Sequence, residues 1–167
     1  MTYDLKEVYV VFYPHNLVDE RIMEHSILNL HNCGIDPSHI IIVSWKPIHS
    51  KFCCLRNIIY QPQPTTYEGW KLTQYNIFSQ IQLGLSHIPK DPIVFMAEHD
   101  VLYPPDHHFE CLKSFRPDCI NYNLNTVCIS ASGFWVMNTI TGLPSLLSQA
   151  HAYKSSFMAS IRYRLGL

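Results

Sequence analysis

The chain has 167 residues, of which 47% are apolar and 15% are charged, with a formal net charge of −1 and a pI of about 6.8. This length and composition are typical of one folded domain and exclude a largely disordered chain. The near-zero charge argues against a protein held to nucleic acid mainly by phosphate contacts, although a local basic patch stays open.

The sequence is typical neither of a secreted protein nor of a membrane protein. No apolar stretch approaches the roughly 20 residues of a membrane helix, and the first residues, MTYDLKEVYVVFY, carry charges where a signal peptide is apolar. None of the six cysteines forms a CxxC pair, so a zinc or redox framework is not expected. We therefore expect reduced thiols in a cytoplasmic protein without a membrane segment.

The first part of the chain predicts alternating strands and helices. Continuous apolar runs at 7–13, 40–45 and 93–97 predict three buried strands. Apolar residues at helical spacing predict helices over 18–34 and 67–87. A strand, a helix and a second strand within about 40 residues indicate a right-handed parallel crossover.

The later part is less regular. Segment 48–66 contains Gln-Pro-Gln-Pro and predicts an extended loop. Short β-like runs occur at 119–123 and 134–137, and 145–165 predicts a final helix with a basic end. The order of elements predicts a single α/β domain over 1–167, a sheet with helices on its faces.

Two carboxylates, Glu98 and Asp100, directly follow the third apolar strand. In open α/β sheets, ligands bind beyond the carboxyl ends of the strands, so segments 13–15, 44–47 and 98–100 should meet. Burying two carboxylates is costly without a partner, and a divalent cation is a natural one. A Glu-x-Asp pattern alone is a weak signal, since charge often meets solvent at the end of a strand.

The surrounding run VFMAEHDVLYPPDHHF resembles a group of small GT-A-like glycosyltransferases from bacteria and bacteriophages. VSWKP, the helix end QIQLGL and NYNLN at 121–125 extend the resemblance. It implies a GT-A-like, Rossmann-type, mostly parallel sheet with helices on both faces. The donor-binding half would span about 7–103, and 104–167 would complete the acceptor and metal sites. The resemblance also implies a location in the cytoplasm of a bacterium or of a phage-infected host.

The resemblance also implies an activity, which is transfer of a sugar from a nucleoside-diphosphate sugar, with UDP favoured and Mn²⁺ or Mg²⁺ as cofactor. Glu98 would lie near the ribose or the sugar, and Asp100 would bind the metal. His151 would be a third metal ligand, although any one of ten histidines is more often structural. A metal on the diphosphate assists departure of the leaving group.

Other positions are candidate donor contacts. Tyr13 could stack on uracil, Lys46 could meet phosphate or ribose, and Tyr75 and Gln80 could contact the base or ribose. Each also has an ordinary structural interpretation as a strand-end tyrosine, a solvated lysine or a surface polar residue.

The catalytic candidates are Glu98, Asp100 and Asp118. Asp118 is one of three downstream carboxylates that could serve as general base, with Asp106 and Glu110, and the sequence does not distinguish among them. The acceptor could be a hydroxymethylated pyrimidine in DNA, approached by scattered cations, or a glycan or lipid-linked saccharide. A non-catalytic nucleotide-binding module or a metal-dependent phosphohydrolase is the alternative. So short a chain leaves the acceptor site minimal or shared within a homo-oligomer.

Overall fold

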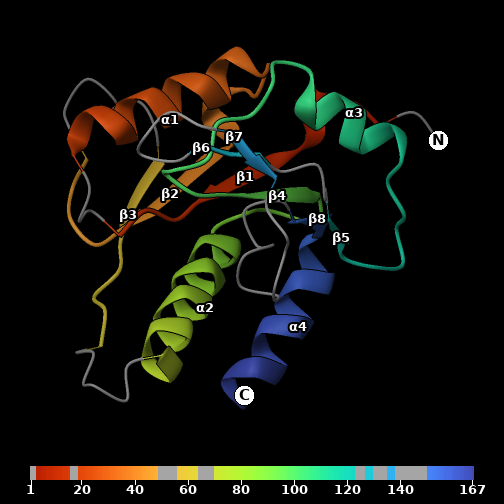
Figure 1. Cartoon of the computed structure of the whole chain (residues 1–167). Coiled ribbons are helices and arrows are strands. Elements are labelled where there is room, and N and C mark those ends of the chain that lie inside the picture. The colour runs from red at the N-terminus through yellow and green to blue at the C-terminus, as the bar shows by residue number, and fades with distance from the viewer. Residues whose placement is uncertain are drawn as a thin grey trace.

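A computed structural model of the chain describes residues 3–15, 19–48, 56–63, 70–122, 127–129, 135–137 and 150–167. Its centre is a six-stranded sheet with the strand order β3-β2-β1-β4-β8-β5. The strands are β1 (Tyr9–Phe12), β2 (Ile40–Ser44), β3 (Arg56–Ile59), β4 (Ile93–Ala97), β5 (Asn121–Tyr122) and β8 (Ala150–Tyr153). The first four are mutually parallel, and β8 runs antiparallel between β4 and β5 (Figure 1).

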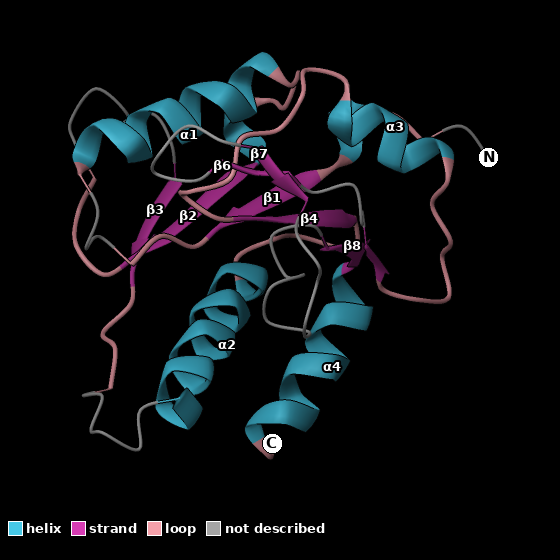
Figure 2. Cartoon of the chain, viewed as in Figure 1, coloured by secondary structure: helices cyan, strands magenta, loops and turns pink. Residues whose placement is uncertain are grey.

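Helices cover both faces of this sheet (Figure 2). The helix α1 (Glu20–Asn32) and the short α3 (His107–Lys113) lie on one face, while α2 (Trp70–Ser86) and α4 (Lys154–Leu165) lie on the other. Two short 3-10 helices, η1 (Leu5–Glu7) and η2 (Pro37–His39), precede β1 and β2. The predicted α/β architecture, with a mostly parallel sheet and helices on both faces, is confirmed.

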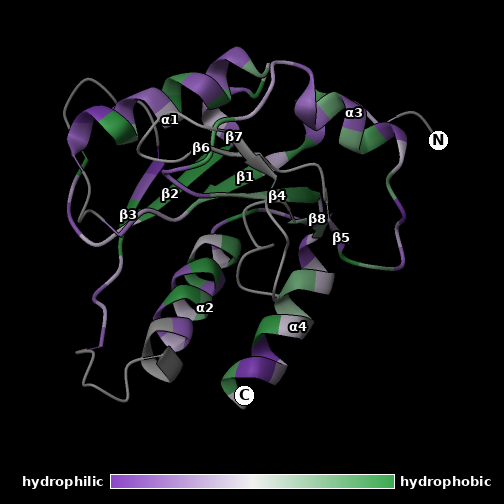
Figure 3. Cartoon of the chain, viewed as in Figure 1, coloured by the Kyte–Doolittle hydropathy of each residue, from purple (hydrophilic) through white to green (hydrophobic). Residues whose placement is uncertain are grey.

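The strands alternate between two apolar cores. Val10 and Phe12 face α1 and α3, whereas Val11 and Tyr13 face α2 and α4. The same alternation continues in β2 and β4, whose residues are all buried. Figure 3 shows this as a continuous hydrophobic band along the central strands. A strand buried on both faces has no polar side, which explains why these three strands appear in the sequence as unbroken apolar runs.

Three elements differ from the prediction. Residues 56–59, expected in a loop, form β3, which pairs with β2 at the edge of the sheet. Residues 150–153, expected in the final helix, form β8, because pairing with β4 and β5 outweighs the helix propensity of two alanines. The helix α3 was not predicted.

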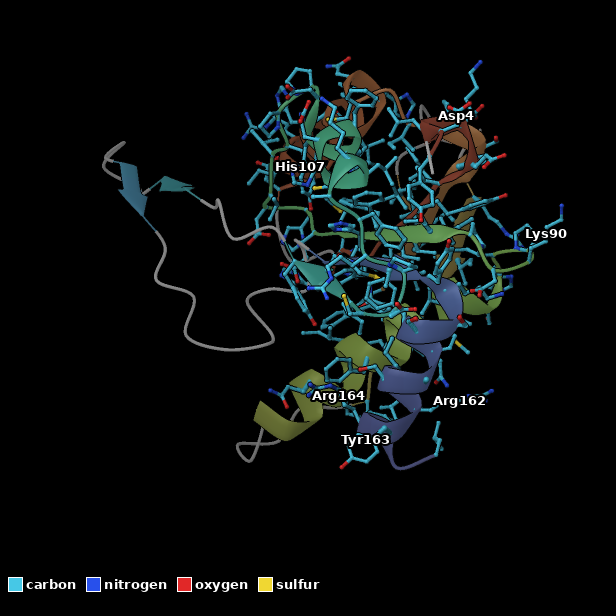
Figure 4. All side chains as sticks on the ribbon, turned by 90° about the vertical axis from the view of Figure 1, so that its right-hand side faces the viewer. Asp4, Lys90, His107, Arg162, Tyr163 and Arg164 are labelled. Carbon is cyan, nitrogen blue, oxygen red and sulfur yellow. The ribbon has the colours of Figure 1, made fainter. Side chains whose placement is uncertain are left out.

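A separate antiparallel pair consists of β6 (Val127–Ile129) and β7 (Trp135–Met137). Figure 4 shows this pair standing clear of the six-stranded sheet. Within the described residues, no helix is long and apolar enough to cross a membrane.

Candidate functional site

The acidic residues follow β4 in the middle of the sheet, beside the end of β1. The backbone N–H of Tyr13, just after β1, donates to the carbonyl of Ala97, the last residue of β4, at 3.1 Å. Glu98 and Asp100 come next along the chain. The carboxyl ends of β1 and β4 are thus held side by side. This confirms that Tyr13 and the acidic pair lie at the edge of the sheet where ligands of open α/β folds bind.

Glu98 is partly buried, and its surroundings disfavour its negative charge. Burial first, and then the carboxylate of Asp100, raise the pKa of Glu98 to about 7, against a smaller lowering effect of the Tyr13 hydroxyl. No Lys or Arg from the described part of the chain contributes to this balance. Two neighbouring carboxylates of like charge therefore share this edge. A bound cation would relieve their repulsion, so the residues present fit a hard divalent ion.

Two buried tyrosines border the same carboxyl group. Burial first, and Glu98 second, raise the pKa of Tyr13 and of Tyr103 well above the ordinary value. The Tyr103 hydroxyl donates to the carbonyl of Met96 at 3.5 Å. The Tyr13 hydroxyl lies near Glu98 but forms no hydrogen bond of normal geometry with a described residue. Because Tyr13 is only 4% exposed, it offers almost no ring surface for a stacked base in this conformation.

Helix α1 anchors the segment that follows the acidic pair. The side-chain amide of Asn29 donates to the carbonyl of Tyr103 at 2.9 Å, and its oxygen accepts from the N–H of Tyr103 at 2.7 Å. One turn earlier, the hydroxyl of Ser26 donates to the carbonyl of His99. Sequence analysis missed both residues, since a polar side chain on the inner face of an apolar helix is the only signal they give.

Gln80 of α2 joins the ends of β1 and β2. It is buried, and its amide nitrogen donates to the carbonyl of Pro14 at 2.9 Å and to that of Val43. Its oxygen accepts from the indole N–H of Trp45 at 3.3 Å. The amide predicted to contact a donor is therefore already engaged with the protein, and Gln80 shapes the site from beneath.

His99 lies within the site rather than acting only as a spacer. Its ring packs edge-on against that of His15, with 4.3 Å between centroids, and His15 in turn lies 5.9 Å from Trp45. Burial first, and then His15, lower the pKa of His99. His99 is therefore neutral near pH 7, and two imidazole rings extend the surface between the ends of β1, β2 and β4.

The other two residues predicted to contact the nucleotide sugar, Lys46 and Tyr75, are exposed. Lys46 directly follows β2 and Trp45, at the same edge of the sheet, and its carbonyl accepts from the Ser44 hydroxyl at 2.6 Å. Tyr75 lies on α2, five residues before Gln80, which is about 7.5 Å along a helix. Lys46 is thus well placed to meet a ligand at this edge, and Tyr75 lies farther out on the helix.

Two predicted residues belong to the part of the sheet around β8 and β5. His151 on β8 pairs with Phe95, five residues before Asp100, and its ring stacks on that of Phe95 with 4.8 Å between centroids. Asp118 lies in the turn three residues before β5, which runs parallel to β4. The strand pairing therefore places the backbone of His151 level with Phe95 and not with Asp100. The roles of His151 as a metal ligand and of Asp118 as a base stay predictions.

In the part of the chain that the structure describes, no three His, Cys, Asp or Glu side chains gather in a way that could hold a metal ion by themselves. A cation at this edge would have Asp100 as its carboxylate ligand, with Glu98 beside it, and oxygens of a substrate and waters would complete its shell. Such sparse protein ligation is usual for Mg²⁺ bound together with a phosphate group.

Comparison with protein families, curated proteins and solved structures found no match to this chain.

Proposed function

We propose that this protein is a metal-dependent glycosyltransferase of GT-A-like type that uses a nucleoside-diphosphate sugar, preferably a UDP-sugar. The observation that carries the proposal is the pair Glu98 and Asp100, two neighbouring carboxylates at the carboxyl edge of a central parallel strand. A diphosphate carries concentrated negative charge, so it can approach two carboxylates only together with a cation. Such a cation, when bound, stabilises the departing diphosphate as a Lewis acid.

The two carboxylates have different surroundings and therefore different roles. Asp100 is exposed and can reach a cation shared with the diphosphate. Glu98 is partly buried beside Tyr13 and Tyr103, where its raised pKa suits a group that exchanges a hydrogen bond with a ribose or sugar hydroxyl. The exposed Lys46 at the end of β2 supplies positive charge for the phosphates. The segment from His99 to Tyr103 is held in position by Ser26 and Asn29.

The acceptor is the more open part of the proposal. A hydroxymethylated pyrimidine in DNA would need cations gathered on one face. Lys113 pairs with Glu110 at 2.5 Å on α3, whereas Arg56 on β3 donates to the carbonyl of His87 at 3.0 Å. Arg162 and Arg164 lie near the end of α4 (Figure 4). Since these cations lie on different sides of the sheet, a saccharide acceptor is an equal candidate. Salt-dependent retention on a DNA column distinguishes the two classes.

A thermal-shift panel tests the donor site. We expect Mn²⁺ and a UDP-sugar together to raise the Tm of the wild type by several degrees, because a ligand of the folded state stabilises it. Asp100→Asn should abolish the shift, and Glu98→Gln should reduce it. Glu7→Gln, an exposed carboxylate at the other edge of the sheet, is the matched control and should keep the full shift. Absence of any shift across a broad panel of nucleotide sugars would overturn the proposal.

Product analysis then separates transfer from hydrolysis. A phosphohydrolase or a simple nucleotide-binding module would use the same carboxylates. Release of UDP that requires an added acceptor, together with a glycosylated product, supports the transferase. Release of UDP and free sugar at the same rate without an acceptor would assign the protein to the hydrolases.

A further inference from the structure

A cavity lies at the opposite, amino edge of the sheet. It has a volume of about 480 Å³, which is within the range of pockets that hold small molecules. Its floor includes Val8 and Ile93, buried residues at the starts of β1 and β4. Glu98 follows the other end of β4, so this cavity is separate from the candidate donor site.

Aromatic rings form much of the cavity wall. Tyr9 stacks on His39 with 4.2 Å between centroids and an interplanar angle of 20°. Tyr3 and Tyr153 each set an edge against Phe115, at 5.1 Å and 5.4 Å. The hydroxyl groups of these two tyrosines also interact, which raises the pKa of Tyr153. Neighbouring side chains thus hold the rings in place around the cavity before any ligand arrives.

The charges at the cavity are mostly negative. Asp4, Glu7 and Asp91 line it, and among the described residues that line it Lys90 is the only Lys or Arg. Figure 4 shows Asp4 and Lys90 at the same end of the molecule, with the Lys90 side chain reaching away from the body. Cations are attracted both to carboxylates and to the faces of aromatic rings.

The three carboxylates differ in how far the protein already engages them. Both oxygens of Asp91 accept hydrogen bonds from Ser155, at 2.7 and 2.8 Å, and an oxygen of Asp4 accepts from the N–H of Lys6 at 3.0 Å. The side chain of Glu7, in contrast, forms no hydrogen bond or ion pair with another side chain or backbone group in the described ranges, and only its backbone N–H is engaged, with the carbonyl of Asp4 at 3.0 Å. An ammonium group beside Glu7, with its apolar part among the tyrosines, would use both features.

We infer that this cavity binds a small organic cation, namely an amine with an apolar or aromatic body. The inference rests on charge sign and ring placement at the amino edge, and it does not depend on the glycosyltransferase proposal. It gives the protein a second ligand site, on the far side of β1 and β4 from the first.

Isosteric probes test the inference by isothermal titration calorimetry. Tryptamine, tryptophol and indole-3-acetate share one ring system and differ in charge. We expect tryptamine to bind about tenfold more tightly than tryptophol and indole-3-acetate to bind least, because a cation–π contact and an exposed ion pair are together worth on the order of a factor of ten. Raising the salt concentration should narrow the difference between the amine and the alcohol.

Variants and spectra locate the binding. Glu7→Gln should weaken tryptamine about three- to tenfold and leave tryptophol unchanged, while Asp100→Asn, at the other edge, should change neither. Backbone amide shifts in NMR spectra should occur at Val8 and Ile93. Equal affinity for amine and alcohol, an unchanged Glu7→Gln variant, or shifts confined to the residues around Glu98 would each overturn the inference. Glu7→Gln does not alter the candidate donor site. Weaker tryptamine binding by this variant therefore leaves the Tm shift with Mn²⁺ and UDP-sugar unchanged, and the two proposals can fail separately.

Discussion

The side chain of Asn29 pairs with both backbone groups of Tyr103, donating to its carbonyl at 2.9 Å and accepting from its N–H at 2.7 Å. A single amide on α1 thereby fixes the segment that follows the acidic pair. The two hydrogen bonds span 74 residues of sequence. They tie the first helix to the candidate donor site.

Replacing Asn29 tests this anchor. Asn29→Leu removes both hydrogen bonds and should lower the free energy of unfolding by about 1–3 kcal/mol, because two backbone groups lose their partner. It should also reduce the Tm shift caused by Mn²⁺ and UDP-sugar. Asn29→Asp keeps the acceptor for the Tyr103 N–H and should give intermediate values. Asn32→Leu, at an exposed position of the same helix, is the control in urea unfolding, and an equal loss there would refute the anchor.

Replacing Gln80 tests whether this residue supports the site or contacts the sugar donor directly. Gln80→Met has a similar volume but leaves the carbonyls of Pro14 and Val43 without their donor, so it should cost about 2–4 kcal/mol. If Gln80 only shapes the site, donor affinity measured well below the melting temperature should change less than tenfold. A complete loss of donor binding in a folded Gln80→Met protein would instead assign it to the donor.

Gly84 marks the closest approach of α2 to the sheet. A Cβ atom there would lie 2.8 Å from a methyl group of Val11 and 2.9 Å from one of Val43. Alanine improves helix propensity by about 1 kcal/mol, but overpacking costs about 1–3 kcal/mol. We therefore expect Gly84→Ala to destabilise the protein, and Ser86→Ala on the same helix to be neutral or stabilising. The free energy of unfolding of both variants, measured by chemical denaturation, shows whether overpacking outweighs the gain in helix propensity.

Buried histidine makes stability depend on pH. Burial first, and then His107 and His151, lower the pKa of His108 from 6.5 to about 3. Between pH 6.5 and 3, His108 is therefore protonated in the unfolded chain but stays neutral in the folded protein. The free energy of unfolding should fall by up to about 1.4 kcal/mol per pH unit between pH 6.5 and 3 on account of this residue.

Urea unfolding at pH 7, 6, 5 and 4 measures that slope. In His108→Leu the slope should become shallower, and the lowered pKa values of His99 and His107 should account for part of what remains. His25→Gln, an exposed histidine of α1, should keep the slope of the wild type. A slope that is unchanged in His108→Leu would exclude His108 as its source.

The sequence predicted the central strands well because a parallel strand buried on both faces leaves an unbroken apolar run. It also placed Tyr13 and Glu98 at one edge, because the carboxyl ends of parallel strands share an edge. The edge strand at 56–59 and the strand at 150–153 were missed, since Arg56 and Asn57 interrupt one pattern and two alanines favour a helix in the other. The register of His151 with Phe95 could not be predicted for the same reason, since it depends on the pairing of β8 with β4.

The insertion of β8 between β4 and β5 has a consequence for protein synthesis. β5 is made about 30 residues earlier than β8, yet within the described sheet it pairs only with β8. On the ribosome, β5 must therefore wait, unpaired, until residues 150–153 have left the exit tunnel. The four parallel strands can assemble first, and β5 can join the sheet only after β8 has been made. A chaperone that holds nascent chains would meet this protein with β4 still exposed along one edge.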